Sequence, residues 1–240
     1  AAFEYTRNPL WKGSLRLEGR KESSQTSYLA TAAYAAKVNR DWSFIARDYL
    51  SVTDRKSGQT GVQNRFQLGM AYRPVDNDAL ALLARVEYLV DRNAGGTKSK
   101  NDRLIFAASA NYHPIRSIWL SGRVAAKMLV NDVNNYSAYT VGLRGIYDIT
   151  ENWDLGLQAG MLADNTGAMS YSAGLEVGRA IATNLWLSGG YNFVGFHDDD
   201  LADSYTDQGA YLRLRYKFDE DLFGGGDTEE DSTAGPNTSF

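Results

Sequence analysis

The chain has 240 residues with no cysteine and two histidines, and its 29 acidic residues nearly balance its 25 basic ones. The missing thiols exclude a disulfide scaffold, a thiolate metal site and a cysteine nucleophile, and the net charge of -4 gives no indication of nucleic-acid binding. A mean hydropathy of -0.40 and the lack of any apolar run of about 18 residues exclude a helical membrane protein. Fifteen tyrosines, five tryptophans and 23 glycines are instead typical of strands and turns.

From Lys12 onward, segments of about ten to thirteen residues alternate apolar and polar side chains, which is the pattern of a transmembrane β-barrel. We therefore expect an all-β fold, an antiparallel up-and-down barrel of about twelve strands, the even number that bacterial single-chain barrels have. The expected strands cover residues 12–22, 26–38, 42–53, 62–73, 80–90, 103–113, 118–130, 136–148, 152–162, 169–180, 184–196 and 208–218.

The connections between these segments alternate in length. Short ones, such as 39–41 and 149–152, alternate with longer polar ones, such as 91–102 and 197–207. Short periplasmic turns and longer extracellular loops produce this alternation in outer-membrane barrels. The sequence therefore predicts the outer membrane of a Gram-negative bacterium, with both termini on the periplasmic side.

The tryptophans gather at the short-turn end of the expected strands, at positions Trp11, Trp42, Trp119, Trp153 and Trp186. Because indole favours the membrane interface, we interpret them as a periplasmic aromatic girdle; the alternative is that they cap a soluble core. Two of them share a strand face with serines, so Trp119 and Trp186 point inward unless a bulge shifts the register.

The two faces of the strands differ in charge. The more apolar face, for example Leu155, Leu157 and Met161, suits lipid. The opposite face is expected to give the lumen a basic lining of Arg16, Arg20, Arg47, Arg65, Arg85, Arg123, Lys127, Arg144, Arg213, Arg215 and Lys217, with the acidic partners Glu18, Glu87 and Glu176. Asp48 falls on the lipid face, so we expect a bulge or a shifted register there.

Two interpretations of this lumen stay open. Neighbouring arginines and glutamates pair and, with a filling segment, plug a narrow barrel; or the lumen is a water-filled pore that concentrates anions. We expect residues 1–11 to form a periplasmic or lumen segment, 12–218 the barrel, and 219–240 an acidic flexible tail.

The sequence HDDD at 197–200 is the most concentrated set of ionisable residues. Asp198, Asp199 and Asp200 are weak candidates for a metal-binding loop, and His197 beside them is a weak candidate for activating water. An ordinary acidic loop is the favoured interpretation, because the residues are adjacent and no second acidic pair accompanies them. We therefore expect no metal, no cofactor and no enzymatic activity.

Three stretches near the C-terminus carry a resemblance: GYNFVGF, the Asp-rich loop after it, and GAYLRLRYKF. Over roughly the last 35 residues of the barrel, the chain resembles the final hairpin of large bacterial surface proteins that end in an outer-membrane barrel. GAYLRLRY also looks like a barrel-assembly signal, although the chain does not end at Phe218 as that signal requires. By architecture alone, the chain is similar to small acidic-sugar porins.

The resemblance implies that the barrel is the membrane anchor or translocation barrel of a larger surface assembly. The implied partners are outer-membrane lipid and lipopolysaccharide, the barrel-assembly machinery during insertion, and a surface or secretion partner chain; no nucleic acid is expected. The alternative function is an anion-favouring diffusion porin for small acidic solutes. A hydrolase at the barrel rim, using His197, is a third and weaker alternative.

Overall fold

The computed structural model describes residues 1–56, 60–76, 79–95, 97–131, 135–182, 185–198, 200–201 and 206–216. Within these residues it contains thirteen strands. They are β1 (Ala2–Tyr5), β2 (Trp11–Lys21), β3 (Gln25–Lys37), β4 (Trp42–Arg55), β5 (Thr60–Tyr72), β6 (Leu80–Gly95), β7 (Thr97–Ile115), β8 (Ile118–Asn131), β9 (Asn135–Thr150), β10 (Trp153–Asp164), β11 (Met169–Ala182), β12 (Leu185–Val194) and β13 (Gly209–Tyr216). No helix long and apolar enough to span a membrane occurs in this described part of the chain.

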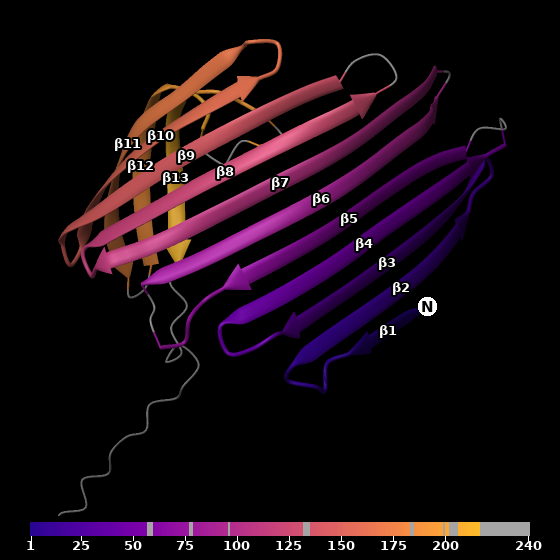
Figure 1. Ribbon diagram of the computed structural model, residues 1–240, viewed down its shortest axis with the longest axis horizontal. Helices are drawn as coiled ribbons and strands as arrows, with labels where there is room; N and C mark the ends of the chain where they lie inside the picture. The colour runs from indigo at the N-terminus through magenta and orange to yellow at the C-terminus, as the bar shows by residue number, and fades with distance from the viewer. Residues whose placement is uncertain are drawn as a thin grey trace, which may run out of the picture.

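All thirteen strands belong to one sheet and follow each other in chain order, so each strand pairs with its sequence neighbour. The sheet is antiparallel and up-and-down, which confirms the predicted fold class. Figure 1 shows that it curls, with β10 to β13 turning behind β8 and β9, so that it has a convex and a concave face. β1 and β13 are the two ends of the strand order, and the sheet is not closed between them in the described residues.

The strand beyond the expected twelve is β1, which lies in the segment 1–11 that we expected to be a periplasmic or lumen segment outside the barrel strands. It forms a hairpin with β2, from Ala2 opposite Arg16 to Tyr5 opposite Gly13. The rings of Tyr5 and Trp11 stack with their centroids 4.5 Å apart. β1 therefore continues the alternation of the sheet, with Phe3 on the same face as Leu15.

The convex face carries the apolar side chains that alternation assigned to the lipid side. Leu143 is 64% exposed and Leu157 is 59% exposed. The register of β10 with β9 and β11 places both side chains on the convex face. Asp48 is on the convex face as well. The expected bulge is wrong, because β4 pairs with β3 and β5 without any shift in register.

Among the described residues, the apolar packing of the concave face lies in its C-terminal half. Ile105, Ala107, Ala125 and Ala138 form a small apolar cluster there with Leu201, which is fully buried. Leu201 comes from the connection between β12 and β13, which folds onto the concave face instead of projecting away from it. We call the described residues of this connection, 195–198 and 200–201, the infolded segment.

Glycines make room for the polar side chains of this half. Gly174 and Gly178 on β11 face the concave side, where an added methyl group would overlap Asn192 and Asp154 respectively. On β12, Gly190 leaves space for the ring of Tyr211 in the same way. Because these positions lack a Cβ, long polar side chains of the neighbouring strands lie flat against the backbone.

Candidate functional site

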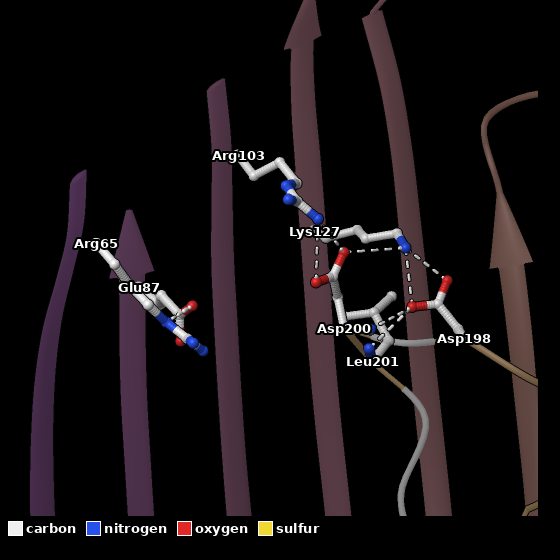
Figure 2. A network of polar contacts seen from close by, with 7 residues as sticks. All are labelled: Arg65, Glu87, Arg103, Lys127, Asp198, Asp200 and Leu201. Carbon is white, nitrogen blue, oxygen red and sulfur yellow. Dashed lines mark hydrogen bonds and ion pairs between the residues drawn. The ribbon is translucent and has the colours of Figure 1, made fainter. Parts of the chain in front are cut away.

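The candidate site is the concave face of β7 to β13 together with the infolded segment. Lys127, on β8, places its Nζ 2.8 and 2.6 Å from the two carboxylate oxygens of Asp198 and 3.5 Å from Asp200. Arg103, on β7, lies 3.3 Å from the same Asp200 carboxylate. Figure 2 shows both aspartates pointing from the segment toward these two cations, so the segment is held to the sheet by opposite charges.

Asp198 also shapes the segment that carries it. Its Oδ1 accepts hydrogen bonds from the backbone amides of Asp200 and Leu201, at 3.0 and 2.9 Å. Burial acts to raise the pKa of Asp198, but the hydrogen bond from Lys127 and the two backbone amides hold that pKa below its ordinary value. The carboxylate therefore stays charged at neutral pH and fixes the turn that buries Leu201.

The return of the connection toward β13 is anchored as well. Asn192, fully buried on β12, donates through Nδ2 to the backbone oxygen of Asp207 at 2.8 Å. Its Oδ1 accepts a hydrogen bond of 2.6 Å from Gln158 on β10. The amide of Phe196 donates to the oxygen of Thr206 at 3.1 Å. Both arms of the connection are thus tied to the concave face.

A second polar network lies below the infolded segment. Glu176, on β11, pairs with Arg144 on one side and with Arg213 at 3.2 Å on the other. Tyr211 donates a hydrogen bond of 3.2 Å to the second oxygen of Glu176. The Glu176 carboxylate is almost fully buried, so one acid neutralises two cations away from water.

Arg215 makes the next ion pair along β13. It pairs with Asp154 of β10, which is 1% exposed, and donates to Ser188 Oγ at 3.3 Å. Asp154 on β10 and Ser188 on β12 both stand opposite Gly178 of the intervening strand β11, on the concave face. The guanidinium groups of the alternating arginines of β13 therefore form ion pairs with buried acidic side chains.

The N-terminal half of the concave face is open. Arg65 still contacts Glu87 at 2.6 Å, and Gln67 donates to the same carboxylate at 2.7 Å. Farther toward the β1 edge, the pair of Arg16 and Glu18 lies at 2.7 Å, but its side chains are 63% and 46% exposed. The Glu87 carboxylate is buried, whereas the Arg16–Glu18 pair is surrounded by solvent and contributes little to stability.

A cavity of about 510 Å³ lies on the concave face, lined mostly by residues of β7 to β13 and of their connections. Arg123, Arg144, Arg213 and Arg215 line it, together with the neutral polar side chain of Gln158. The infolded segment closes one side of it through Phe196 and Leu201. The arrangement can hold water and small anions, but three of these arginines already contact buried acids.

The strand register places the predicted basic residues on the concave face wherever the structure describes them: Arg16, Arg20, Arg47, Arg65, Arg85, Arg123, Lys127, Arg144, Arg213 and Arg215. Lys217 lies outside the described residues. Glu18, Glu87 and Glu176 each contact a cation. That these residues line a membrane lumen stays a prediction.

Sequence reasoning missed three members of the site. Arg103 and Asp154 have concave parity but lie at or near the first residue of the segments expected from the sequence, 103–113 and 152–162, and β7 in fact begins at Thr97. The pairing of Asp198 and Asp200 with cations of β7 and β8 was missed because the loop was expected to point outward. The alternation of segment 103–113 already placed Arg103 beside Ile105 and Ala107, so parity alone could have found it.

The tryptophans lie at one end of the sheet but on two faces. Trp11, Trp42 and Trp153 are on the convex face, where Trp42 packs on Tyr72 with ring centroids 4.7 Å apart. Trp119 and Trp186 are on the concave face, so they do not belong to an outward girdle. No bulge brings them outward, because the pairs Trp119–Ile146 and Trp186–Arg215 keep concave parity.

The acidic loop does not form a metal site in the residues that the structure describes. No group of three or more histidine and acidic side chains able to hold a metal occurs among them. Asp198 and Asp200 face cations, and Asp199 lies outside the described residues. His197 is largely exposed and lies 3.3 Å from Asp207. The described carboxylates of this loop thus serve ion pairs.

No protein-family model matches the chain, and no curated protein does. Among solved structures, the chain is similar to the NanC porin, at 10% identity over 85% of this chain and 100% of that chain, with a TM-score of 0.43. It is also similar to a Pseudomonas aeruginosa FadL homologue, at 12% identity over 89% and 74% of the two chains, with a TM-score of 0.46. Outer-membrane expressed OmpT of Vibrio cholerae matches at 14% identity over 90% and 87%, with a TM-score of 0.48.

Proposed function

We propose that this chain is the membrane-embedded part of an outer-membrane β-barrel assembly, and that it acts as an anchor whose interior is occluded. The observation that carries the proposal is the pair of strand edges at β1 and β13. The convex apolar face supplies the lipid contact, and lipid and lipopolysaccharide are the proposed surroundings. The short-turn end of the sheet would face the periplasm.

The direction of the edge strands supports an assembly larger than this sheet. Adjacent strands alternate in direction, so β1 and β13, both odd-numbered, run the same way. Pairing them directly would be parallel, whereas the described neighbours in the sheet pair antiparallel. An odd number of further strands between them would restore the alternation, so we infer that additional polypeptide completes the barrel.

The exposed apolar side chains of β13 also support an assembly larger than this sheet. Leu212 is 72% exposed, more than Leu143 at 64% and Leu155 at 39% on the inner strands of the convex face. Leu214 is 64% exposed. A bilayer offers no water for unpaired backbone groups, so an open edge is costly there. A second copy in the same membrane orientation presents the same two edges and again gives parallel pairing. The further strands therefore belong to polypeptide other than the described residues of this chain.

The interior favours an anchor over an open pore. Lys127, Arg144, Arg213 and Arg215 contact buried carboxylates, which cancels most of the positive field that an anion channel needs. The infolded segment also fills the space above them with Leu201 and Phe196. Passage through this half requires that segment to move.

Paired cysteines test the open edges, because the chain has no cysteine of its own. In outer membranes, Leu15→Cys or Phe3→Cys would each be combined with Leu212→Cys or Leu214→Cys and then oxidised. Leu17→Cys with Ala30→Cys, which are direct partners on β2 and β3, is the matched control. We expect the control to form an intramolecular disulfide and the edge pairs not to do so. Edge pairs as efficient as the control would mean that the chain closes alone, and would overturn the proposal.

An anion-favouring channel is the second candidate, because four arginines line the cavity of about 510 Å³. Single-channel conductance in planar bilayers with a salt gradient separates the two functions. The anchor predicts silence from the complete assembly. A steady anion-selective current that falls in the double variant Arg213→Ala/Arg215→Ala would establish the channel instead.

A further inference from the structure

Three cations lie on the concave face of β2 to β4, near the short-turn end of the sheet. They are Lys12, Lys37 and Arg47, and we call them the basic rim. Lys12 stands opposite Ala35 on β3. Arg47 stands opposite Ala33 of the same strand, and Lys37 shares the parity of Ala33. The three strands are adjacent and about 4.8 Å apart, so the cations gather in a patch roughly 15 Å across.

The basic rim lacks the counter-charges that other cations of the concave face have. All three of its residues are exposed, and the described part of the chain places no carboxylate within ion-pairing distance of them. Glu4, on the concave face of the adjacent β1, forms no ion pair with Lys12. Arg16, by contrast, pairs with Glu18 at 2.7 Å. The rim is therefore a positively charged surface that is open to a ligand of opposite charge.

The chain itself contains a segment of opposite charge. Residues 219–240 carry seven acidic residues and no lysine, arginine or histidine. Four of the acids, here called the acidic cluster, lie within five positions: Asp227, Glu229, Glu230 and Asp231. Residues 217–240 lie outside the described residues, so we infer where the cluster binds from its charge, from the point where the described chain ends and from the reach of the segment.

The described chain ends on the same side of the sheet as the basic rim. β13 ends at Tyr216, which stands opposite Leu185, the first residue of β12 after a short turn. β3 and β13 are both odd-numbered and run in the same direction, so β13 ends at the end of the sheet where Lys37 ends β3. Residues 219–240 therefore start from the short-turn end, where the rim lies.

The acidic cluster is within reach of the rim. Nine strand spacings separate β13 from β4, which is about 43 Å along the sheet, and the curl seen in Figure 1 makes the straight path shorter. Asp231 is fifteen residues after Tyr216, and a chain of that length extends to about 50 Å. The acids at 219–221 follow β13 too closely to span this distance, so the cluster is the first acidic part of the segment that can bind there.

We propose that the acidic cluster docks on the basic rim of its own chain. Exposed ion pairs are individually weak and keep much of their water, so the docked segment leaves this face accessible to small solutes. The covalent link raises the effective concentration of the cluster to about the millimolar range, which favours it over the same segment of a second copy. Lipid and lipopolysaccharide contact the convex face in the proposed membrane arrangement, whereas the rim is on the concave face.

The docked cluster would cancel the positive field of the rim, so the proposal goes beyond an anchor function and gives the open half of the interior its own counter-charge. Both surfaces belong to this chain, so the contact is independent of how the barrel is completed. Disulfides between the edges of β1 and β13 test the completion of the barrel, and their outcome does not bear on the docking of the cluster.

Cysteine pairs in the full chain test the contact. Thr228→Cys lies inside the acidic cluster and is combined with Ser43→Cys, which is on the concave face of β4 opposite Lys37. The matched control is Ser51→Cys, eight residues farther along the same face of β4. We expect oxidation in outer membranes to link Thr228→Cys to Ser43→Cys within one chain about ten times faster than to Ser51→Cys, the effect of a few exposed ion pairs. Equal rates, or a product mainly of twice the chain mass, would overturn the proposal.

Removal of the acidic charges shows whether they cause the contact. The variant that neutralises the cluster combines Asp227→Asn, Glu229→Gln, Glu230→Gln and Asp231→Asn. We expect it to slow the link to Ser43→Cys to the rate of the Ser51→Cys control, and about 0.5 M NaCl to do the same in the unchanged cluster. The cluster follows the last described strand, so we expect the variant to insert and to keep the heat-dependent gel mobility of a folded barrel. An unchanged rate at Ser43→Cys in the neutralised variant would overturn the proposal.

Discussion

The two halves of the concave face obey the same alternation of side chains but reach different states. At Glu176 the carboxylate is 2% exposed and pairs with two arginines, whereas at Glu18 it is 46% exposed and pairs with one. The charges are alike, so the difference comes from their surroundings. In the C-terminal half, glycines on the concave face and the infolded segment exclude water from the ion pairs. Most strands of the N-terminal half have neither feature.

An alternating strand pattern therefore determines on which face of the sheet a side chain lies, but it does not determine whether that face is hydrated. Desolvated ion pairs in the C-terminal half are costly to break, because loss of one partner leaves a buried charge. Exposed pairs in the N-terminal half are replaced by water when broken. Substitutions of the same kind in the two halves should therefore differ strongly in their effect on stability.

Removal of one acid from each half should give the largest contrast. Glu176→Gln leaves Arg144 and Arg213 without their shared counter-charge, and we expect it to lower the free energy of unfolding by about 3–5 kcal/mol. Glu18→Gln should change it by less than about 1 kcal/mol. Urea titration of the protein folded in lipid vesicles measures both. Equal losses would show that the two faces are equally hydrated.

Truncation of the buried leucine should have the next largest effect. Leu201→Ala removes the fully buried side chain of the infolded segment, and we expect a loss of about 2–3 kcal/mol in its docking. Ile45→Ala, on the open concave half where Ile45 is 52% exposed, should cost less than about 1 kcal/mol. Hydrogen exchange of residues 195–201 reports the docking. Unchanged protection in Leu201→Ala would mean that the ion pairs alone hold the segment.

Addition of a methyl group distinguishes crowded from open concave glycines. Gly174→Ala would overlap Asn192 and should cost about 1–3 kcal/mol. Gly142→Ala, also concave, has open space around its added carbon and should change stability by less than about 0.5 kcal/mol. The same urea titration compares them. A neutral Gly174→Ala would show that Asn192 moves freely and does not anchor the connection.

Acid should loosen the infolded segment and leave the open half unchanged. The pKa of Asp198 is depressed in the folded state. The stabilisation that its carboxylate gives to the docked segment is therefore complete above the ordinary aspartate pKa of about 3.9, and it is lost as the pH falls through the lower pKa of the folded state. We expect protection of residues 195–201 from hydrogen exchange to hold from neutral pH to about pH 4 and to fall below it. In Asp198→Asn, the same residues should be less protected from hydrogen exchange over the whole pH range, and their protection should show no step near pH 4. An equal step in that variant would mean that another group causes the change.

Alternation in the sequence was sufficient for the fold class and for the face of each charged residue. Arg213 and Arg215 were assigned to the polar face because Leu212 and Leu214 alternate with them, and the register agrees. The same reasoning failed at Asp48, where we assumed that lipid forbids a carboxylate and therefore expected a bulge. A local preference does not outweigh an uninterrupted ladder of backbone hydrogen bonds on both sides of β4.

The partners of the charges could not be predicted in the same way. Glu176 meets Arg144 and Arg213 across several strands, and such pairs depend on how far the sheet curls. The position of the infolded segment depends on Lys127 and Arg103, which are about 70 to 100 residues distant along the chain. Strand β1 was missed because Ala2–Tyr5 is too short to show a period of its own.

Water access to single concave positions tests the central claim most directly. Ala138→Cys lies under the infolded segment, at a position with no exposed surface, and Ala33→Cys is on the concave face of β3. We predict that a membrane-impermeant methanethiosulfonate reagent labels Ala33→Cys quickly and Ala138→Cys slowly in outer membranes, and that Asp198→Asn accelerates only the second. Equal labelling rates at the two positions would contradict an occluded C-terminal half and, with it, the anchor.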